Sequence, residues 1–169
     1  TESLVDLSGE PFIENMVDAY LPTVSAGDGI YGVPTEGSLG GGILYNNKIY
    51  GDLGLTVPKT WDELVALADK IVADGSVPFC ASAGGPGTAT GWQLTDWVEE
   101  VLLKSEDPQV TQDWISHTIP FTDPEIKEAF DSVGLILQNP DYVNAGFGDI
   151  KSINATAFGD VAAKVADGS

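Results

Sequence analysis

The sequence contains no arginine: its 7 basic residues are all lysines, and 26 aspartates and glutamates give it a formal net charge of -19. Binding to nucleic acid needs clustered cations, with arginine supplying the bidentate contacts to phosphate. Docking on an anionic lipid surface needs polybasic stretches. The charge therefore argues against nucleic acid and lipid as partners, and it favours a neutral ligand over an anionic one.

Cysteine and histidine each occur once, as Cys80 and His117. A single cysteine forms no internal disulfide and no CxxC metal or redox site. A single histidine without other soft ligands near it in sequence builds no zinc site, so we expect no metal and a solvated His117 at a helix-to-loop junction. Cys80 lies in the apolar run 77–81, which predicts a packed, unreactive thiol.

The common signatures of catalysis and of membrane spanning are also missing. There is no G-x-S-x-G motif, and the glycine-rich stretches 40–42 and 84–87 lack the lysine and Ser/Thr of a phosphate-binding loop. No apolar run approaches 18 residues. A carboxylate pair could hydrolyse glycosides, but among 26 acidic residues any chosen pair is weak evidence. We expect a protein that is not an enzyme and holds no cofactor.

The chain of 169 residues, 43% of them hydrophobic, is long enough to bury a core. A capping box at Thr60 predicts a helix over 60–74, and a second at Thr122, with proline in the first turn, predicts another over 123–137. Apolar residues at helical spacing predict further helices over 91–104, 108–116 and 155–166. In the last of these we expect Phe158 on the buried face.

Three short apolar runs, 30–34, 43–46 and 77–81, predict strands. Strands that alternate with helices indicate an α/β fold, so we expect 43–46 and 77–81 to share a sheet that the helices flank. A glycine-rich stretch at 37–42 separates the first two runs and is the best candidate for a hinge.

The chain has four tryptophans, and one of them stands at a place where ligands bind. Trp61 and Trp97 fit the core, and Trp114 fits either environment. Trp92 lies where a glycine-rich loop meets a helix, and an aromatic face near polar groups is a common way to bind a sugar. Taken alone, a core role for Trp92 is slightly favoured over a ligand platform.

Several motifs then occur in a recognisable order. They are Tyr31-Gly32-Val33-Pro34, Tyr45-Asn46-Asn47-Lys48, Pro58-Lys59-Thr60-Trp61-Asp62-Glu63-Leu64 and Phe121-Thr122-Asp123-Pro124-Glu125. In this order they resemble the extracellular solute-binding proteins of bacterial ABC sugar importers, the maltose-binding-protein-like family. The resemblance extends from about residue 30 to residue 169 and is weaker over 3–20.

The resemblance implies a two-lobed, Venus-flytrap α/β protein that is much longer than this chain, so we expect truncation at both ends. Residues 1–35 would be a remnant of the first lobe and the strand entering the hinge, 36–42 the hinge crossing, and 43–169 the front part of the second lobe. A sheet edge should then stay unpaired where the next strand would lie.

The function implied is binding without chemistry: a carbohydrate sits between the lobes and passes to ABC permease subunits in the membrane. The location implied is extracellular or periplasmic, with a lipid anchor on the full-length protein, and a fragment need not bind sugar alone. The resemblance places ligand contacts at Glu36, Ser38, Thr90 and Trp92, and hinge residues at Gly37, Gly40 and Gly41.

Two alternatives remain open at this point. One is a binding protein for another solute, an oligopeptide or a polyamine, and the other is a carboxylate-pair glycosidase. A polyamine pocket needs two or more carboxylates in the cleft, and only Glu36 is placed there. We also expect Glu36 and Trp92 to line one cleft.

Overall fold

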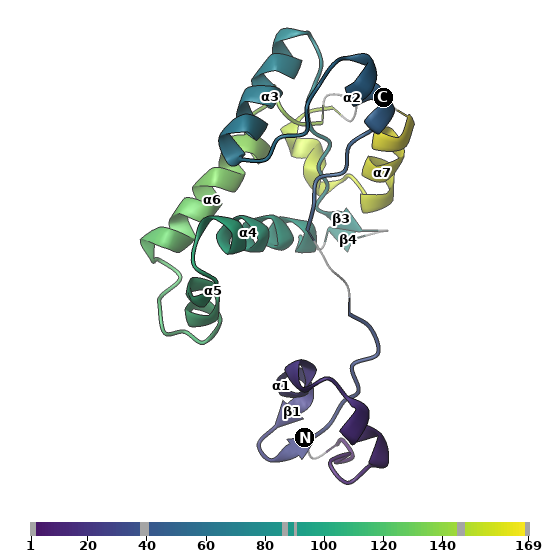
Figure 1. Ribbon diagram of the computed structural model, residues 1–169, viewed down its shortest axis with the longest axis vertical. Coiled ribbons are helices and arrows are strands. Elements are labelled where there is room, and N and C mark those ends of the chain that lie inside the picture. Colours follow the sequence, from purple (N-terminus) through teal and green to yellow (C-terminus); the bar gives the residue numbers. More distant parts are fainter. Residues whose placement is uncertain (1–2, 38–40, 86–87, 90, 145–147, 168–169) are drawn as a thin grey trace. The chain divides into compact units, whose positions relative to one another are not determined.

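The computed structural model describes residues 3–37, 41–85, 88–89, 91–144 and 148–167. The chain forms two compact units, residues 1–40 (unit 1) and 41–169 (unit 2), shown in Figure 1. Within the described ranges, no helix has both the length and the apolar character needed to cross a bilayer.

Unit 1 consists of short elements. They are the 3-10 helices η1 (Pro11–Asn15) and η2 (Asp18–Tyr20), helix α1 (Leu21–Val24), and strands β1 (Ser25–Ala26) and β2 (Gly29–Ile30). The strands pair antiparallel, with Ser25 opposite Ile30. The backbone N–H of Ile30 donates to the Ser8 hydroxyl at 3.1 Å, which ties the start of the chain to this hairpin.

The strand expected over 30–34 is therefore wrong in extent, because the paired strand ends at Ile30. The N–H of Tyr31 still donates to the carbonyl of Val24 at 2.9 Å. Beyond it the ladder stops, and Pro34, which has no backbone N–H, cannot extend it.

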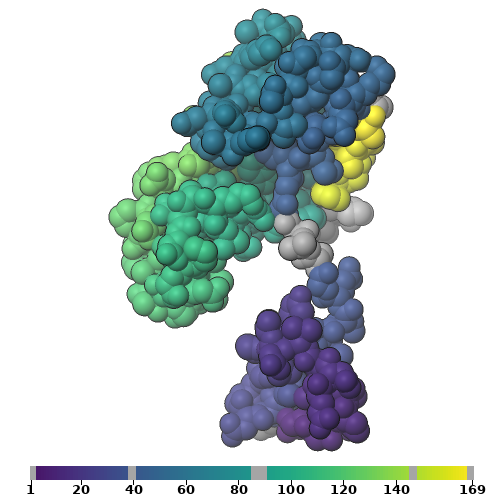
Figure 2. Space-filling model, viewed as in Figure 1, coloured from purple at the N-terminus to yellow at the C-terminus, as the bar shows by residue number. Residues whose placement is uncertain are grey.

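Unit 2 is mostly helical. Its helices are α2 (Asn47–Asp52), α3 (Trp61–Ala73), α4 (Trp92–Ser105), α5 (Pro108–Ile115), α6 (Pro124–Leu137), η4 (Ile150–Asn154) and α7 (Phe158–Asp167). Five of them match the expected helices to within a few residues. In the space-filling view, the blue surface of α2 and α3 adjoins the green surface of α4 to α6 (Figure 2).

The predicted caps explain why these helices begin where they do. The hydroxyl of Thr60 accepts a hydrogen bond from the N–H of Glu63 at 3.2 Å, and the Asp123 carboxylate accepts from the N–H of Glu125 at 3.1 Å. The Glu63 carboxylate reaches back to the N–H of Lys59 at 2.7 Å, one residue earlier than a standard capping box.

The core of unit 2 lies between α3, α4, α6 and the extended segment 79–83. Leu102, Ile126, Ile136 and Val143 are its largest fully buried apolar side chains. α4 and α6 pack side by side (Figure 1). Trp61 and Trp97 are partly buried against this core, which confirms their expected packing role.

The expected sheet of 43–46 with 77–81 is wrong. No described segment pairs with 43–45, and Leu44 is 69% exposed. A strand is held by its partner's backbone groups, so an apolar run without a partner stays irregular. Next to this run, Asn46 caps α2 by accepting from the N–H groups of Lys48 and Ile49, a signal that the sequence analysis missed.

Segment 77–81 is only partly a strand. Phe79 forms an isolated parallel bridge with Val143, and Gly84 forms another with Ala157. Strands β3 (Gly84–Gly85) and β4 (Thr88–Ala89) form a short antiparallel hairpin. In the described part of unit 2, β-pairing is thus limited to single bridges and one two-residue ladder. These short pairings support the starts of the helices.

Candidate ligand-binding site

Trp92 is the first residue of α4 and is 46% exposed. The residue before it, Gly91, has φ 73°, a left-handed conformation that glycine adopts without strain. The N–H of Gly91 donates to the carbonyl of Ala83 at 2.9 Å, which fixes where the helix starts. The turn therefore presents the indole of Trp92 at the surface. The sequence left open whether Trp92 is a core residue, and the structure shows that its side chain is not fully buried.

The extended residues Ala83 and Gly84 connect the start of α4 to the segment that leads into α7. Nε2 of Gln93 donates to the carbonyl of Gly84 at 2.9 Å. On the other side, the N–H of Ala83 donates to the carbonyl of Ile153 at 2.8 Å, and the N–H of Gly84 donates to that of Thr156 at 3.1 Å. One short segment thus positions the first residues of two helices.

This arrangement brings together two aromatic rings that are far apart in sequence. The rings of Trp92 and Phe158, the first residues of α4 and α7, have centroids 5.7 Å apart and planes tilted by 48°. Phe158 is 55% exposed. The expectation that Phe158 faces the core is therefore wrong, because the residue lies at the helix start, where the side chain contacts Trp92.

Gln93 has a buried amide oxygen that accepts no hydrogen bond in the described part of the chain. The nitrogen of the same amide is used, since it holds Gly84. A buried acceptor without a partner is costly, and such a group is a common site for an ordered water or a ligand hydroxyl.

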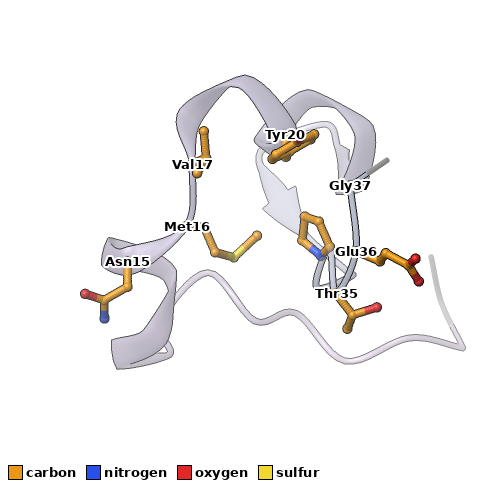
Figure 3. A pocket seen from close by; sticks show the side chains of 8 residues that line it. Asn15, Met16, Val17, Tyr20, Thr35, Glu36 and Gly37 are labelled. Atoms are coloured by element: carbon orange, nitrogen blue, oxygen red, sulfur yellow. The ribbon is translucent and has the colours of Figure 1, made fainter. Parts of the chain in front are cut away.

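Glu36 and Gly37 line a small cavity that lies wholly within unit 1, with a volume of about 250 Å³. Figure 3 shows Met16 and Tyr20 facing its centre, whereas the exposed carboxylate of Glu36 points away from it. A Cβ on Gly37 would lie 2.7 Å from the hydroxyl oxygen of Tyr20, so the backbone passes close to that ring.

Of the four remaining expected site residues, one, Gly41, lies among the described residues. Gly41, assigned to the hinge, has φ 80°, a left-handed conformation that favours glycine, and it lies close to the side chain of Glu100. Ser38, Gly40 and Thr90 lie outside the described residues. Glu36 belongs to unit 1 and Trp92 to unit 2, so the cleft that would join them stays a prediction.

A second, larger hollow of about 590 Å³ lies within unit 2, among α4, α5, α6 and η4. Three aromatic rings contribute to it: Phe121 has its centroid 5.8 Å from that of Trp114 and 5.5 Å from that of Phe130. None of the described residues that line the hollow is titratable. Trp114, which fitted either environment in the sequence, therefore lines an apolar hollow.

The imidazole of His117 is solvent-exposed, as predicted, whereas the thiol of Cys80 is less buried than the core position that the sequence predicted. Cys80 is half-buried, and burial raises the pKa of its thiol, an effect that nearby Lys164 partly opposes. His117 is exposed, just after the end of α5, with φ 60°. Within the described ranges, no three His, Cys, Asp or Glu side chains are grouped so that they could hold a metal ion.

The helices of unit 2 pack around short strands and single β-bridges, so this unit has an α/β architecture. The same fold occurs in a chitin oligosaccharide binding protein, with a TM-score of 0.68 and 22% identity over 98% of this chain and 39% of that one. It occurs also in the solute-binding protein RafE in complex with raffinose, with a TM-score of 0.58 and 23% identity over 98% and 41% of the two chains.

The family model for the bacterial extracellular solute-binding proteins matches residues 5–165, and the chain belongs to this family. The osmoprotective compounds-binding protein GgtB of Synechocystis sp. is 32% identical over 91% of this chain and 36% of its own length. The alpha-glucosides-binding periplasmic protein AglE of Rhizobium meliloti is 35% identical over 78% of this chain and 29% of its own.

These comparisons confirm the family resemblance that the sequence motifs indicated. The family match also includes residues 5–29, where the resemblance in sequence was weaker. The relatives are binding proteins. The chain spans about a third of their length, with 36% of GgtB and 29% of AglE covered.

Proposed function

We propose that the whole protein carrying this chain is the carbohydrate-binding component of an ABC importer, which holds a neutral sugar between two lobes and delivers it to permease subunits. The observation that carries the proposal is the family match over residues 5–165. Among the relatives, AglE is named for alpha-glucosides, and a Streptococcus mutans protein that is 33% identical over 58% of this chain is named for multiple sugars.

The exposed indole of Trp92 supplies the chemistry that the proposal needs. The C–H face of a pyranose packs on an aromatic face, while its hydroxyls take hydrogen bonds from polar side chains. Neither aromatic packing nor hydrogen bonding breaks a covalent bond, so the proposed protein acts by binding and releasing its ligand. The net charge of -19 supports a neutral ligand, because an anionic one would be repelled.

The proposal keeps Glu36, Ser38, Thr90 and Trp92 as ligand contacts, and Gly37, Gly40 and Gly41 as hinge residues. The hinge is supported by the boundary between the two units, which falls between Gly40 and Gly41 and thus inside the crossing 36–42. Residues 1–35 would then belong to the first lobe and 43–169 to the second. Closure about this crossing would enclose the sugar.

The location and the partners follow from the family. Its members are bacterial extracellular proteins, and we place this protein outside the cytoplasmic membrane. We also propose that the whole protein carries a lipid anchor and contacts specific permease subunits. An exported binding protein needs to stay near its transporter.

Calorimetric titration of the whole protein tests the function directly. The panel should hold neutral oligosaccharides, including alpha-glucosides, raffinose and chitin oligosaccharides, together with a short peptide and spermidine. We expect binding to one class of neutral sugar. Trp92→Ala should weaken it about tenfold, the upper end of what an aromatic contact contributes.

A matched control is Phe121→Ala, which removes another exposed aromatic ring, 63% exposed, from the separate hollow of unit 2. It should leave sugar affinity unchanged. Binding of spermidine, with a loss of several kcal/mol in Glu36→Gln, would instead favour the polyamine alternative, because a buried cation would lose its partner. Turnover of chromogenic glycosides would favour the glycosidase.

A further inference from the structure

The hollow of unit 2 is lined mainly by apolar and aromatic side chains, several of which are open to solvent. Its volume is about 590 Å³, and none of the described residues that line it is titratable. Phe121 is 63% exposed and Phe130 is 43% exposed, and their ring centroids lie 5.5 Å apart. A contiguous cluster of exposed aromatic rings is uncommon on a surface without a partner, so it indicates a surface that is covered in the whole protein.

Helix α6 carries two apolar stripes. The stripe that is buried in the core of unit 2 consists of Ile126, Ala129, Val133 and Ile136. The other stripe lines the hollow with Phe130, Gly134 and Leu137, whose spacing places them on one side of the helix. A helix that packs on one neighbour needs one apolar stripe, so the second stripe indicates a second packing neighbour.

Helices α4 and α6 form two walls of the hollow. They pack side by side, and Leu94 and Val98 of α4 line the same hollow as Phe130 and Gly134 of α6 (Figure 1). The wall is low at Gly134, because the atom nearest to a Cβ there would belong to the flexible side chain of Gln138, at 3.7 Å. An apolar groove between two helices, with a small residue in one wall, fits the apolar face of a third helix.

We propose that the hollow of unit 2 binds an amphipathic helix from the part of the same polypeptide that lies outside these 169 residues. The chain covers only 36% of GgtB and 39% of the chitin oligosaccharide binding protein, so most of each of these proteins lies outside the matched part. The bound helix places bulky apolar side chains against Phe121, Phe130 and Gly134. This packing does not depend on sugar binding, so its test needs no ligand.

Electrostatics disfavours a second copy of the chain as the occupant. Each copy has a formal net charge of -19, and like charges oppose the approach of two copies. Carboxylates also stand next to lining residues in sequence, since Asp113 precedes Trp114 and Asp149 precedes Ile150. A helix of the same polypeptide is favoured instead, because the covalent connection gives it a high effective concentration at the hollow.

Thermal unfolding of the whole protein tests the proposal. Phe121→Ala should lower the melting temperature by about 5 °C or more, because truncation of a covered aromatic side chain leaves a cavity. The matched control is Leu53→Ala, just after α2, since Leu53 is 64% exposed and Phe121 is 63% exposed. The control should change the melting temperature by less than about 1 °C. Equally small effects of both changes would show that the hollow is open, and would overturn the proposal.

A second variant, Gly134→Leu, gives a test in which the sign of the effect decides. In an open hollow, leucine has room and is a better helix former than glycine, so the melting temperature would rise by about 1–3 °C. Under a covering helix, the added side chain meets other side chains, so we expect a fall of about 3 °C or more. A rise would overturn the proposal even if Phe121→Ala failed to fold.

The dependence on protein concentration identifies the occupant. An intramolecular contact does not depend on concentration, so the effect of Phe121→Ala on the melting temperature should be the same when the whole protein is diluted. Sedimentation velocity gives the oligomeric state of the wild type and of Phe121→Ala. A dimer that Phe121→Ala dissociates would identify a second copy as the occupant and would overturn the proposal.

Discussion

The side-chain amide of Asn144 pairs with both backbone groups of Ala81. Its Oδ1 accepts from the N–H of Ala81 at 2.7 Å, and its Nδ2 donates to the carbonyl of the same residue at 2.9 Å. Asn144 is fully buried and has φ 60°. The amide takes the place of a strand residue, which explains why Phe79–Ala81 stays extended although only Phe79 pairs as a strand.

Asn144→Ala should therefore be strongly destabilising. It leaves the N–H and carbonyl of Ala81 unpaired in the core and places a Cβ-bearing residue without local hydrogen bonds in a left-handed conformation. We expect the free energy of unfolding to fall by about 3 kcal/mol or more in urea titrations. Asn144→Gly relieves the backbone strain and should recover about 1 kcal/mol of that loss. Equal stability of Asn144→Ala and wild type would contradict this account.

Gly84 is required by packing. A Cβ there would lie 2.8 Å from the carbonyl oxygen of Thr156 and 3.2 Å from that of Asn154, both of which are backbone atoms. Gly84→Ala should cost about 1–3 kcal/mol, because the two segments must separate. The change should also disturb the contact between the rings of Trp92 and Phe158, since the starts of both helices are bonded to the segment Ala83–Gly84.

The matched control is Gly51→Ala, in the last turn of α2, where a Cβ would meet no atom within 4 Å. Alanine is the better helix former, so this variant should be stabilised by about 0.5–1 kcal/mol. Thermal unfolding of both variants gives the comparison. A Gly84→Ala protein as stable as the control would show that residues 154–156 move freely.

The hydroxyl of the buried Tyr142 donates to the carboxylate of Asp69. This hydrogen bond raises the pKa of the Tyr142 phenol, since ionisation would remove the donor and set two negative charges side by side, and burial adds to the rise. Because the folded-state pKa is raised, the stabilisation is complete below the unfolded value of about 10 and is lost as pH rises through the folded value.

Tyr142→Phe should therefore lower the free energy of unfolding by about 1 kcal/mol at neutral pH, and this difference should shrink above about pH 10. Urea titrations of both proteins across that range measure it. Asp69→Asn keeps an acceptor without the charge, so Tyr142 should titrate closer to its ordinary pKa. A wild-type advantage that persists at high pH would mean that the phenol is not the donor.

Salt should stabilise this protein, because its formal net charge is -19 and the Debye length falls from about 10 Å at 0.1 M to about 3 Å at 1 M salt. Screening weakens repulsion among the carboxylates more than it weakens three exposed helical ion pairs, Lys48–Asp52, Lys104–Glu100 and Lys127–Asp131. Such pairs contribute about 0.3–0.5 kcal/mol each. The melting temperature should rise with sodium chloride, and a fall would show that the pairs dominate.

The helices of unit 2 could be predicted because the signals that specify them are local. The caps at Thr60 and Asp123 satisfy backbone groups within the same turn, so a few neighbouring residues determine where α3 and α6 begin. The same reasoning missed α2, whose cap, Asn46, follows an apolar run that resembled a strand. For Trp92 the sequence left two environments open, the core and the surface. A glycine-rich turn before a helix is compatible with either of them.

By itself the sequence determined five helices of unit 2 and the family, since these depend on local spacing and on the order of motifs. The tertiary structure decided which apolar residues are paired, buried or left exposed. Leu44 looked like part of a strand, but it is exposed because strand pairing needs a partner from elsewhere in the chain. Phe158 looked like core, but it contacts Trp92 because Ala83 and Gly84 bond to both helix starts. Contacts between residues so distant in sequence leave no periodic signal, and only folding brings them together.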